Sequence, residues 1–135
     1  MSKQYILPTG IISLKTLTMP SNTNSNGNIF GGWIMSQIDI GGAILAKEIS
    51  GGKVVTVQVN SITFLKPIYV GDIMYCYTKC VKIGVSSMTI DIEIWIKNID
   101  SQPLGQFYCA AYASVIYVAI DTLGRSRKLL PMSIV

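Results

Sequence analysis

One long helix-like segment, Phe30–Ile49, limits most strongly the folds that this chain can adopt. It contains no proline, it ends at the helix-stopping run Ser50–Gly52, and its apolar residues lie on all sides of a helix. A helix that is apolar all round is expected to be buried, so other elements must wrap it. Gly41 and Gly42, near its middle, predict that another backbone approaches closely at that point.

The rest of the chain is typical of β-structure. A polar, turn-rich loop, Pro20–Asn28, precedes the helix, and the sequence Gly84-Val85-Ser86-Ser87 predicts a hairpin. Strict alternation in Met88–Lys97 predicts a half-exposed antiparallel strand. One buried helix and about five long strands predict an α+β fold, in which an antiparallel sheet curls around the central helix. The expected strands are Gly10–Thr18, Val54–Phe64, Ile73–Ile83, Met88–Lys97 and Gln106–Ile120.

The composition predicts one domain, residues 1–135, that associates with copies of itself. Half of the residues are hydrophobic and 13% are charged, so a surplus of apolar surface should be covered in subunit interfaces. The longest apolar run, Phe107–Ile120, is too short for a membrane-spanning helix, and no signal-peptide pattern follows Lys3. With three cysteines, an odd number, we expect reduced thiols, a cytoplasmic location and no membrane partner.

The chain contains no histidine. This excludes Ser-His-Asp and Cys-His catalysis and every histidine-ligated metal site, so we expect no bound metal. The net charge is +4, and the basic residues cluster only at Arg125, Arg127 and Lys128. This cluster suggests a site for anions. It is short and lacks interleaved aromatic residues, so we expect no nucleic-acid partner.

Asp39 is the most informative polar residue, because it is the only charge between Phe30 and Ala46. Burial of an unpaired carboxylate is costly. One interpretation is a structural aspartate, held by the backbone or by a hydroxyl such as that of Ser36. The other is a general base or a nucleophile that lines a cleft.

Gly31 and Gly32 open the same helix, where unobstructed N–H groups lie at the positive end of the helix dipole. They can hold an anion or a developing oxyanion, or they can simply form the turn. Asn24 is one of four asparagines in the preceding loop; most are expected to form turns and caps, and one can donate its amide to a substrate carbonyl.

The helix rise separates these groups. Asp39 follows Gly32 by seven positions, which is about 10 Å along the axis at roughly 1.5 Å per residue. One helix therefore does not place both groups on one reacting atom. Two helices from different subunits, side by side, can do so, and the predicted chemistry favours a dimer with shared sites.

The run NTNSNGNIFGGWIMSQIDIGGAILAKE, residues Asn22–Glu48, resembles the hot-dog-fold acyl-CoA thioesterases, most closely the short bacterial YciA-type hydrolases. The resemblance continues through VTVQVNSITFLKPIYVGDIMYCY, the KIGVSSM hairpin and the GRSRKL segment, from about Leu14 to Leu130. It implies a long helix wrapped by an antiparallel sheet. It also implies dimers that join their sheets edge to edge, commonly three to a hexamer.

The resemblance also implies roles for single residues. Asp39 matches the catalytic carboxylate, Asn24 the asparagine that faces it from the other subunit, and Gly32 the backbone oxyanion donor. Other family members often carry a basic residue where Val85 stands, so a phosphate contact is either absent here or supplied by the basic tail. The residues expected to bind coenzyme A are Gly31, Gly84, Ser86, Ser87, Arg125, Arg127 and Lys128.

The expected function is hydrolysis of acyl-CoA to a free acid and coenzyme A. No cofactor is expected, since coenzyme A is part of the substrate and of the product. A hydratase or dehydratase of the same fold is disfavoured because it usually needs a histidine. A non-catalytic acyl-CoA-binding protein is the alternative of a different class, and the joint presence of Asp39, Asn24 and the Gly31–Gly32 pair argues against it.

Overall fold

The computed structural model describes residues 7–100 and 105–129, which form one long helix and a five-stranded sheet. Each predicted element is present, and its bounds agree with the prediction to within one residue. The order along the chain is β1 (Ile11–Leu17), a 3-10 turn η1 (Pro20–Asn22), α1 (Gly31–Ser50), β2 (Val54–Phe64), β3 (Ile73–Ile83), β4 (Ser87–Asn98) and β5 (Gln106–Ala119).

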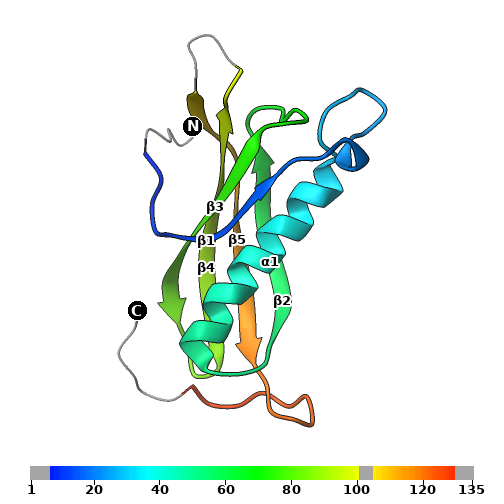
Figure 1. Cartoon of the computed structure of the whole chain (residues 1–135). Helices are drawn as coiled ribbons and strands as arrows, with labels where there is room; N and C mark the ends of the chain where they lie inside the picture. Colours follow the sequence, from blue (N-terminus) through cyan, green and yellow to red (C-terminus); the bar gives the residue numbers. More distant parts are fainter. Residues whose placement is uncertain (1–6, 101–104, 130–135) are drawn as a thin grey trace.

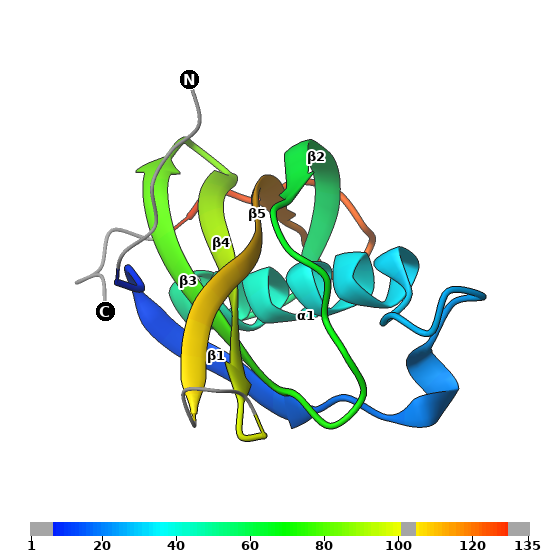
Figure 2. The same cartoon turned by 90° about the horizontal axis from the view of Figure 1, so that it is seen from above.

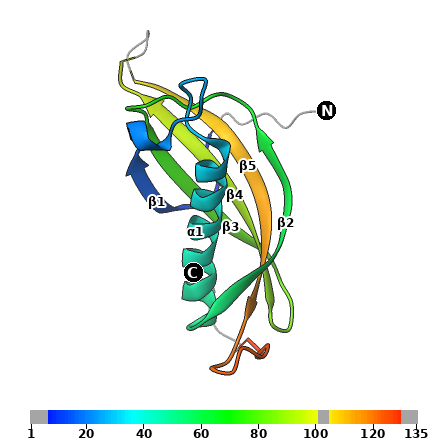
Figure 3. The ribbon, with the colours of Figure 1, turned by 90° about the vertical axis from the view of Figure 1, so that its right-hand side faces the viewer.

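All neighbouring strands in the sheet are antiparallel, in the order β1-β3-β4-β5-β2. The helix lies along one face of this sheet, and the sheet curves around it (Figures 1 and 2). In the side view, no helix formed by the described residues covers the opposite face (Figure 3). The expected α+β arrangement of a central helix and a curled antiparallel sheet is therefore confirmed.

The core lies between α1 and the sheet. Ile34, Ile38 and Leu45 of the helix meet the inward-facing isoleucines of β4, such as Ile92 and Ile94. These side chains are 4% exposed or less, which removes most of their apolar surface from water.

The expectation that α1 is buried on all sides is wrong for the single chain. Met35 and Ile40 are 47% and 48% exposed, because the sheet covers only one side of the helix. Within the described chain, the atoms nearest to a Cβ built at Gly41 or Gly42 belong to side chains of the sheet and not to a backbone. A Cβ at Gly41 would lie 2.3 Å from the sulfur of Cys76 on β3, so the glycine admits a side chain of the sheet.

The outward face of β4 is also more buried than its alternation predicts. Glu93 and Trp95 are 4% and 1% exposed. The Glu93 carboxylate accepts hydrogen bonds from the Trp95 indole N–H (2.8 Å) and the Thr9 hydroxyl (2.6 Å), and Phe107 stacks on Trp95. Local periodicity does not show this cover, because Thr9 lies 84 positions from Glu93.

Candidate active site

The N-terminal end of α1 presents two backbone donors. The N-cap residue, Phe30, makes no side-chain cap, and its carbonyl accepts hydrogen bonds from the amides of Trp33 (3.0 Å) and Ile34 (3.2 Å). The amides of Gly31 and Gly32 have no acceptor among the residues that the structure describes. They are therefore available to a ligand at the positive end of the helix.

Asn24 folds the preceding loop with its carbonyl oxygen. The side-chain oxygen Oδ1 accepts hydrogen bonds from the backbone amides of Asn26 (2.8 Å) and Asn28 (3.1 Å). The backbone amide of Asn24 donates to the backbone carbonyl of Asn28 (2.7 Å). These bonds fix the orientation of the side-chain amide. The Nδ2 group has no acceptor within residues 7–100 and 105–129, so it is free to donate to a substrate.

Asn24 and Gly31 share one hollow at this end of the helix. Its volume is about 340 Å³. It lies between the loop, the start of α1 and the segment after β2, and it is mostly apolar. The other lining residues are Asn28, Ile29, Ile34, Phe64, Leu65, Lys66, Pro67 and Ile68. The structure thus brings two of the sequence-predicted site residues together within one chain.

Asp39 lies further along α1 and is held by two hydroxyl groups. The Thr56 hydroxyl donates to Oδ1 at 2.6 Å, and the Tyr117 hydroxyl lies 2.8 Å from the Asp39 carbonyl oxygen and 3.2 Å from Oδ1. The suggested partner Ser36 is wrong, since its hydroxyl donates to the Trp33 carbonyl. No described residue donates to Oδ2, which leaves this oxygen available.

Thr56 and Tyr117 reach the same carboxylate because they are directly opposite each other on β2 and β5. The register of this pair shifts immediately after Thr56, and such irregularities re-aim side chains near active sites. Sequence analysis missed both residues. A hydroxyl on the inward face of an otherwise apolar strand is the signal that could have found Tyr117, which is fully buried.

The environment of Tyr117 keeps its phenol protonated. Burial is the main cause that raises the pKa of Tyr117, and the nearby charge and hydrogen bond of Asp39 raise it further. The hydroxyl therefore acts as a donor throughout the ordinary pH range.

The structure does not bring Asp39 to Asn24 and Gly32 within the chain. Asp39 is absent from the hollow that contains Asn24 and Gly31. The helix rise still separates it from Gly32 by about 10 Å. A single chain therefore does not bring these three groups together.

The hairpin and the basic tail, which lie far apart in sequence, are joined at the other end of α1. The Leu129 amide donates to the Val85 carbonyl (2.8 Å), and the Ala119 amide donates to the Ser86 carbonyl (2.9 Å). Gly84 closes the hairpin through its amide, which donates to the Ser87 carbonyl (2.8 Å). The two regions expected to hold coenzyme A thus form one surface.

The basic residues on that surface differ in their contacts. Arg125 forms an exposed ion pair with Asp121 (3.3 Å), and the Arg125 backbone amide is the main cause that lowers the pKa of Asp121. Arg127 is half-buried, and it donates through Nε to the Ile120 carbonyl (3.0 Å) and through Nη2 to the Ser50 carbonyl (3.1 Å). Lys128 is exposed. Two of the three cations are therefore already engaged with the protein.

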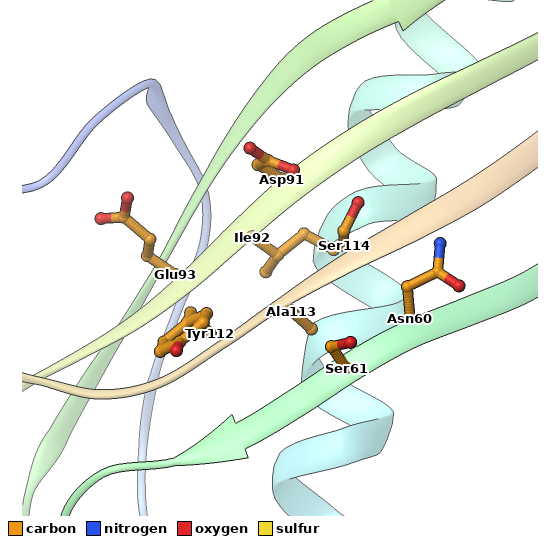
Figure 4. Close-up of a pocket in the computed structure, with 8 residues that line it drawn as sticks. All are labelled: Asn60, Ser61, Asp91, Ile92, Glu93, Tyr112, Ala113 and Ser114. Atoms are coloured by element: carbon orange, nitrogen blue, oxygen red, sulfur yellow. The ribbon is translucent and has the colours of Figure 1, made fainter. Parts of the chain in front are cut away.

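A second hollow, of about 210 Å³, lies across β2, β4 and β5 on the face away from α1 (Figure 4). Asp91, Tyr112 and Ser114 line it together with Asn60 and Ser61. It contains none of the residues expected in the active site. Among the residues described, no group of three or more carboxylates, thiols or histidines is placed to hold a metal ion, and no helix is long and apolar enough to cross a membrane.

Comparison with known protein families gives a match over more than half of the chain. Residues 26–101 match the family described as Thioesterase superfamily. A protein of Buchnera aphidicola, named as an uncharacterized acyl-CoA thioester hydrolase, is 69% identical over all of both chains. The acyl-CoA thioester hydrolase YciA of Escherichia coli is 54% identical over 96% of this chain and 98% of its own.

Solved structures give the same result. A hexameric thioesterase from Yersinia pestis superposes with a TM-score of 0.89 at 55% identity, covering 93% of this chain and all of that one. An acyl-CoA hydrolase from Staphylococcus aureus, solved with butyryl coenzyme A and coenzyme A, has a TM-score of 0.78 at 32% identity, covering 86% of this chain and 69% of that one. Its solved variants include single replacements of an aspartate, a threonine and an asparagine by alanine. The chain therefore belongs to the thioesterase superfamily, as a member with the hot-dog fold and close relatives among the YciA-type acyl-CoA hydrolases.

Proposed function

We infer that this protein is an acyl-CoA thioester hydrolase. It adds water across the thioester: the hydroxyl group joins the acyl carbon, the C–S bond breaks, and the sulfur leaves as the thiol of coenzyme A. The observation that carries this function is the hydroxyl-clamped carboxylate of Asp39, with one oxygen free, in a chain whose relatives are named for this reaction.

The site residues are proposed from their chemistry. Asp39 either removes a proton from water or attacks the carbonyl through Oδ2. The Gly32 amide stabilises the oxyanion, which is worth about 3 kcal/mol for comparable donors. Asn24 orients the carbonyl or the water through Nδ2. In a single turnover in ¹⁸O-labelled water, label in the Asp39 side chain would identify attack by the carboxylate, because a general base gains no oxygen from water.

The spacing of three residues supports this assignment. In the Staphylococcus aureus hydrolase, the asparagine, aspartate and threonine that were replaced are separated by 15 and then 17 positions. Asn24, Asp39 and Thr56 have the same two intervals in this chain. We therefore add Thr56 to the proposed site, as a residue that holds the carboxylate.

We propose that two subunits complete each site and that three dimers form a hexamer. Gly32 and Asn24 of one chain would meet Asp39 of the other, which the helix-rise argument supports. The exposed edge strand β2 carries Val55, Val57 and Val59, which are 40% to 54% exposed, and the helix face with Met35 and Ile40 also lacks cover. The Yersinia pestis and Campylobacter jejuni neighbours are hexameric thioesterases.

We propose that the surface formed by the hairpin and the tail binds the nucleotide of coenzyme A. Gly84, Ser86 and Ser87 offer backbone and hydroxyl groups. The cations Arg125, Arg127 and Lys128 face a polyanionic ligand. Gly31, at the other end of the helix, would contact the thioester end of the substrate through its free amide.

No metal or other cofactor takes part in the proposed reaction, and the enzyme is proposed to work in the cytoplasm. The chemistry available to a histidine-free chain supports the first point. Turnover should be unchanged after treatment with EDTA. Loss of activity that zinc restores would contradict this proposal.

Release of free thiol from acyl-CoA tests the function directly. Purified protein should release coenzyme A catalytically, whereas a protein that only binds acyl-CoA gives no turnover. A short panel of chain lengths in the same assay identifies the preferred acyl group.

Subunit exchange tests the shared site. Chains that carry Asp39→Asn and chains that carry Asn24→Ala should each be inactive, and a mixed dimer has one site with both lesions and one site with neither. Activity should return, toward half of the wild-type value per mixed dimer. The same mixture without exchange should stay inactive. Verified mixed dimers with no recovered activity would remove the pairing of Asn24 with Asp39.

A further inference from the structure

We infer that Tyr117 is a positioning residue of the active site: its hydroxyl holds Oδ1 of Asp39, so that Oδ2 is the oxygen presented to water or to the thioester. This inference rests on the proposed function and assigns a role to a residue outside the set of groups that touch the substrate. Its geometry comes entirely from one chain, so it is independent of how subunits assemble.

The hydroxyl joins two parts of the same residue. It lies 2.8 Å from the main-chain oxygen of Asp39 and 3.2 Å from Oδ1. Its one proton is shared between these acceptors, which ties the side-chain rotamer of Asp39 to the helix backbone. Thr56 adds a second bond to the same oxygen at 2.6 Å. Because Oδ1 accepts hydrogen bonds from both hydroxyl groups, a rotation of the carboxylate that exchanges Oδ1 and Oδ2 would break both of them.

Tyr117 is the more rigid of the two donors. It is 0% exposed, and on β5 it pairs with Met88 of β4 on one side and with Thr56 of β2 on the other. Strand β5 is inside the sheet, whereas β2 is an edge strand (Figures 1 and 3). A donor on an inner strand is held by ladder bonds on both sides, so it gives a fixed reference for the carboxylate.

Gly42 provides the space for this contact. A Cβ at that position would lie 2.3 Å from the Tyr117 hydroxyl oxygen and 2.9 Å from Cε2 of the ring. A side chain there would push the phenol away from the helix. Glycine within a helix costs about 1 kcal/mol relative to alanine. The close approach of Tyr117 explains why this position can use no larger residue without rearrangement.

The competing explanation is that the hydrogen bond from the Tyr117 hydroxyl to the Asp39 carbonyl oxygen only fastens β5 to α1. Loss of this hydrogen bond would then lower the stability of the fold, and any effect on turnover would be independent of the Asp39 carboxylate. The positioning role predicts the opposite: the hydroxyl acts through Asp39, so its effect should disappear when Asp39 is no longer a carboxylate. A double-mutant cycle distinguishes the two cases.

The experiment compares Tyr117→Phe with Tyr77→Phe, which removes a tyrosine hydroxyl from β3 instead. We expect Tyr117→Phe to lower kcat about tenfold, with KM within twofold of wild type. Tyr77→Phe should keep kcat within twofold. In an Asp39→Asn background, Tyr117→Phe should change the residual kcat by less than twofold. Wild-type turnover and the Asp39→Asn loss, measured in the same series, report separately on the proposed function.

Two isosteric replacements keep the test decisive if the phenylalanine variant does not fold. At position 117, 4-aminophenylalanine keeps a donor of similar size, and 4-methylphenylalanine fills the same space without one. The amino form should recover at least half of wild-type kcat, and the methyl form should match the tenfold loss. Equal activity of the two forms, or an undiminished tenfold effect in the Asp39→Asn background, would overturn the positioning role.

Discussion

The two ends of α1 are completed differently. At the C-terminal end, Gly51 adopts the left-handed conformation (φ 73°) and its amide donates to the Lys47 carbonyl, while Arg127 donates to the Ser50 carbonyl. At the N-terminal end, the amides of Gly31 and Gly32 have no acceptor among the described residues. Every helix begins with unpaired donors and ends with unpaired acceptors. Here the chain itself pairs carbonyls of Lys47 and Ser50 at one end, whereas two amides at the other end stay open, as the proposed substrate site requires.

The difference extends along the helix. In the N-terminal half, Asp39 has one oxygen fixed by hydroxyl groups and one left open. In the C-terminal half, Leu45, Ala46 and Ile49 are buried in the core. Ile34 and Ile38 of the N-terminal half are buried as well, so this half combines core packing with the proposed catalytic groups, and substitutions of its polar residues should affect turnover more than stability.

The largest effect on turnover is expected from a substitution of Asp39, in the N-terminal half of α1. Asp39→Asn keeps an oxygen that accepts from Thr56 and Tyr117, so the fold should be unchanged. It removes the charge and the basicity of Oδ2, and kcat should fall by at least about 10²-fold. Steady-state thiol release and thermal unfolding on the same sample check both parts. Glu48→Gln, at an exposed position of the C-terminal half, is the control and should leave kcat unchanged.

Removal of one helix-terminal donor should have the next largest effect. Gly32→Pro deletes the amide in the first helical turn, where proline is tolerated. The kcat value should fall about 10²-fold, as for other lost oxyanion donors. Gly32→Ala keeps the amide, and the nearest atoms to its Cβ belong to the exposed ring of Phe30, which can move. The alanine variant should lose less than about fivefold; an equal loss in both variants would show that space, and not the N–H group, matters at this position.

At the C-terminal end of α1, substitutions should change the stability of the protein. Arg127→Ala removes two charge-assisted bonds to carbonyls, one of them at the helix C-terminus, and should lower the free energy of unfolding by about 1–2 kcal/mol. Arg125→Ala breaks only an exposed ion pair and should have almost no effect on stability. Urea unfolding of the two variants gives this comparison.

The same two variants test the proposed nucleotide contact. Both should raise KM for acyl-CoA more than for a short acyl-pantetheine thioester, which lacks the nucleotide. Arg127 keeps Nη1 for such a contact, since its hydrogen bonds to the described residues use only Nε and Nη2. Equal changes of KM for both substrates would remove the tail from the binding site and leave Arg127 a purely structural role.

The sequence predicted the elements of this fold well because their signals are local. Apolar periodicity, the Ser50–Gly52 stop and the Gly84–Ser87 turn lie inside or beside the segments that they define. The candidate residues Asp39 and Gly32 also stand out locally, one as a lone charge and one as part of a glycine pair at a helix start. No partner from another element is needed to notice them.

The two hydroxyl groups that hold the Asp39 carboxylate could not be predicted in the same way. Thr56 and Tyr117 lie 17 and 78 positions from Asp39, and they converge only through the register of β2 with β5. That register includes a shift beside Thr56, so simple alternation does not give it. The assignment of Arg127 to the helix end depends likewise on a contact across 77 positions.

The smallest expected effect concerns the thiol beneath the helix. Burial raises the pKa of the Cys76 thiol from its ordinary 9.0 to about 12. In the folded protein Cys76 therefore keeps its proton between pH 9 and 12, whereas in the unfolded chain it ionises. The folded state binds more protons in this window, so stability is full below pH 9 and falls as the pH rises toward 12. The thermal midpoint should decline accordingly.

Cys76→Ala should reduce that decline, although it lowers the midpoint at neutral pH because the sulfur fills the space beside Gly41. The useful quantity is the slope of the midpoint between pH 8.5 and 10, below the ordinary pKa of tyrosine, where the buried phenols contribute little. Cys80→Ala should change the slope less, because Cys80 is only half-buried and the smaller rise in its pKa is opposed by a backbone hydrogen bond at Lys82. Turnover at neutral pH should persist in both folded variants, since the Asp39 carboxylate is hydrogen-bonded to Thr56 and Tyr117 and not to either thiol. An unchanged slope in Cys76→Ala would mean that another group controls alkaline unfolding, and lost turnover would point to a thiol nucleophile.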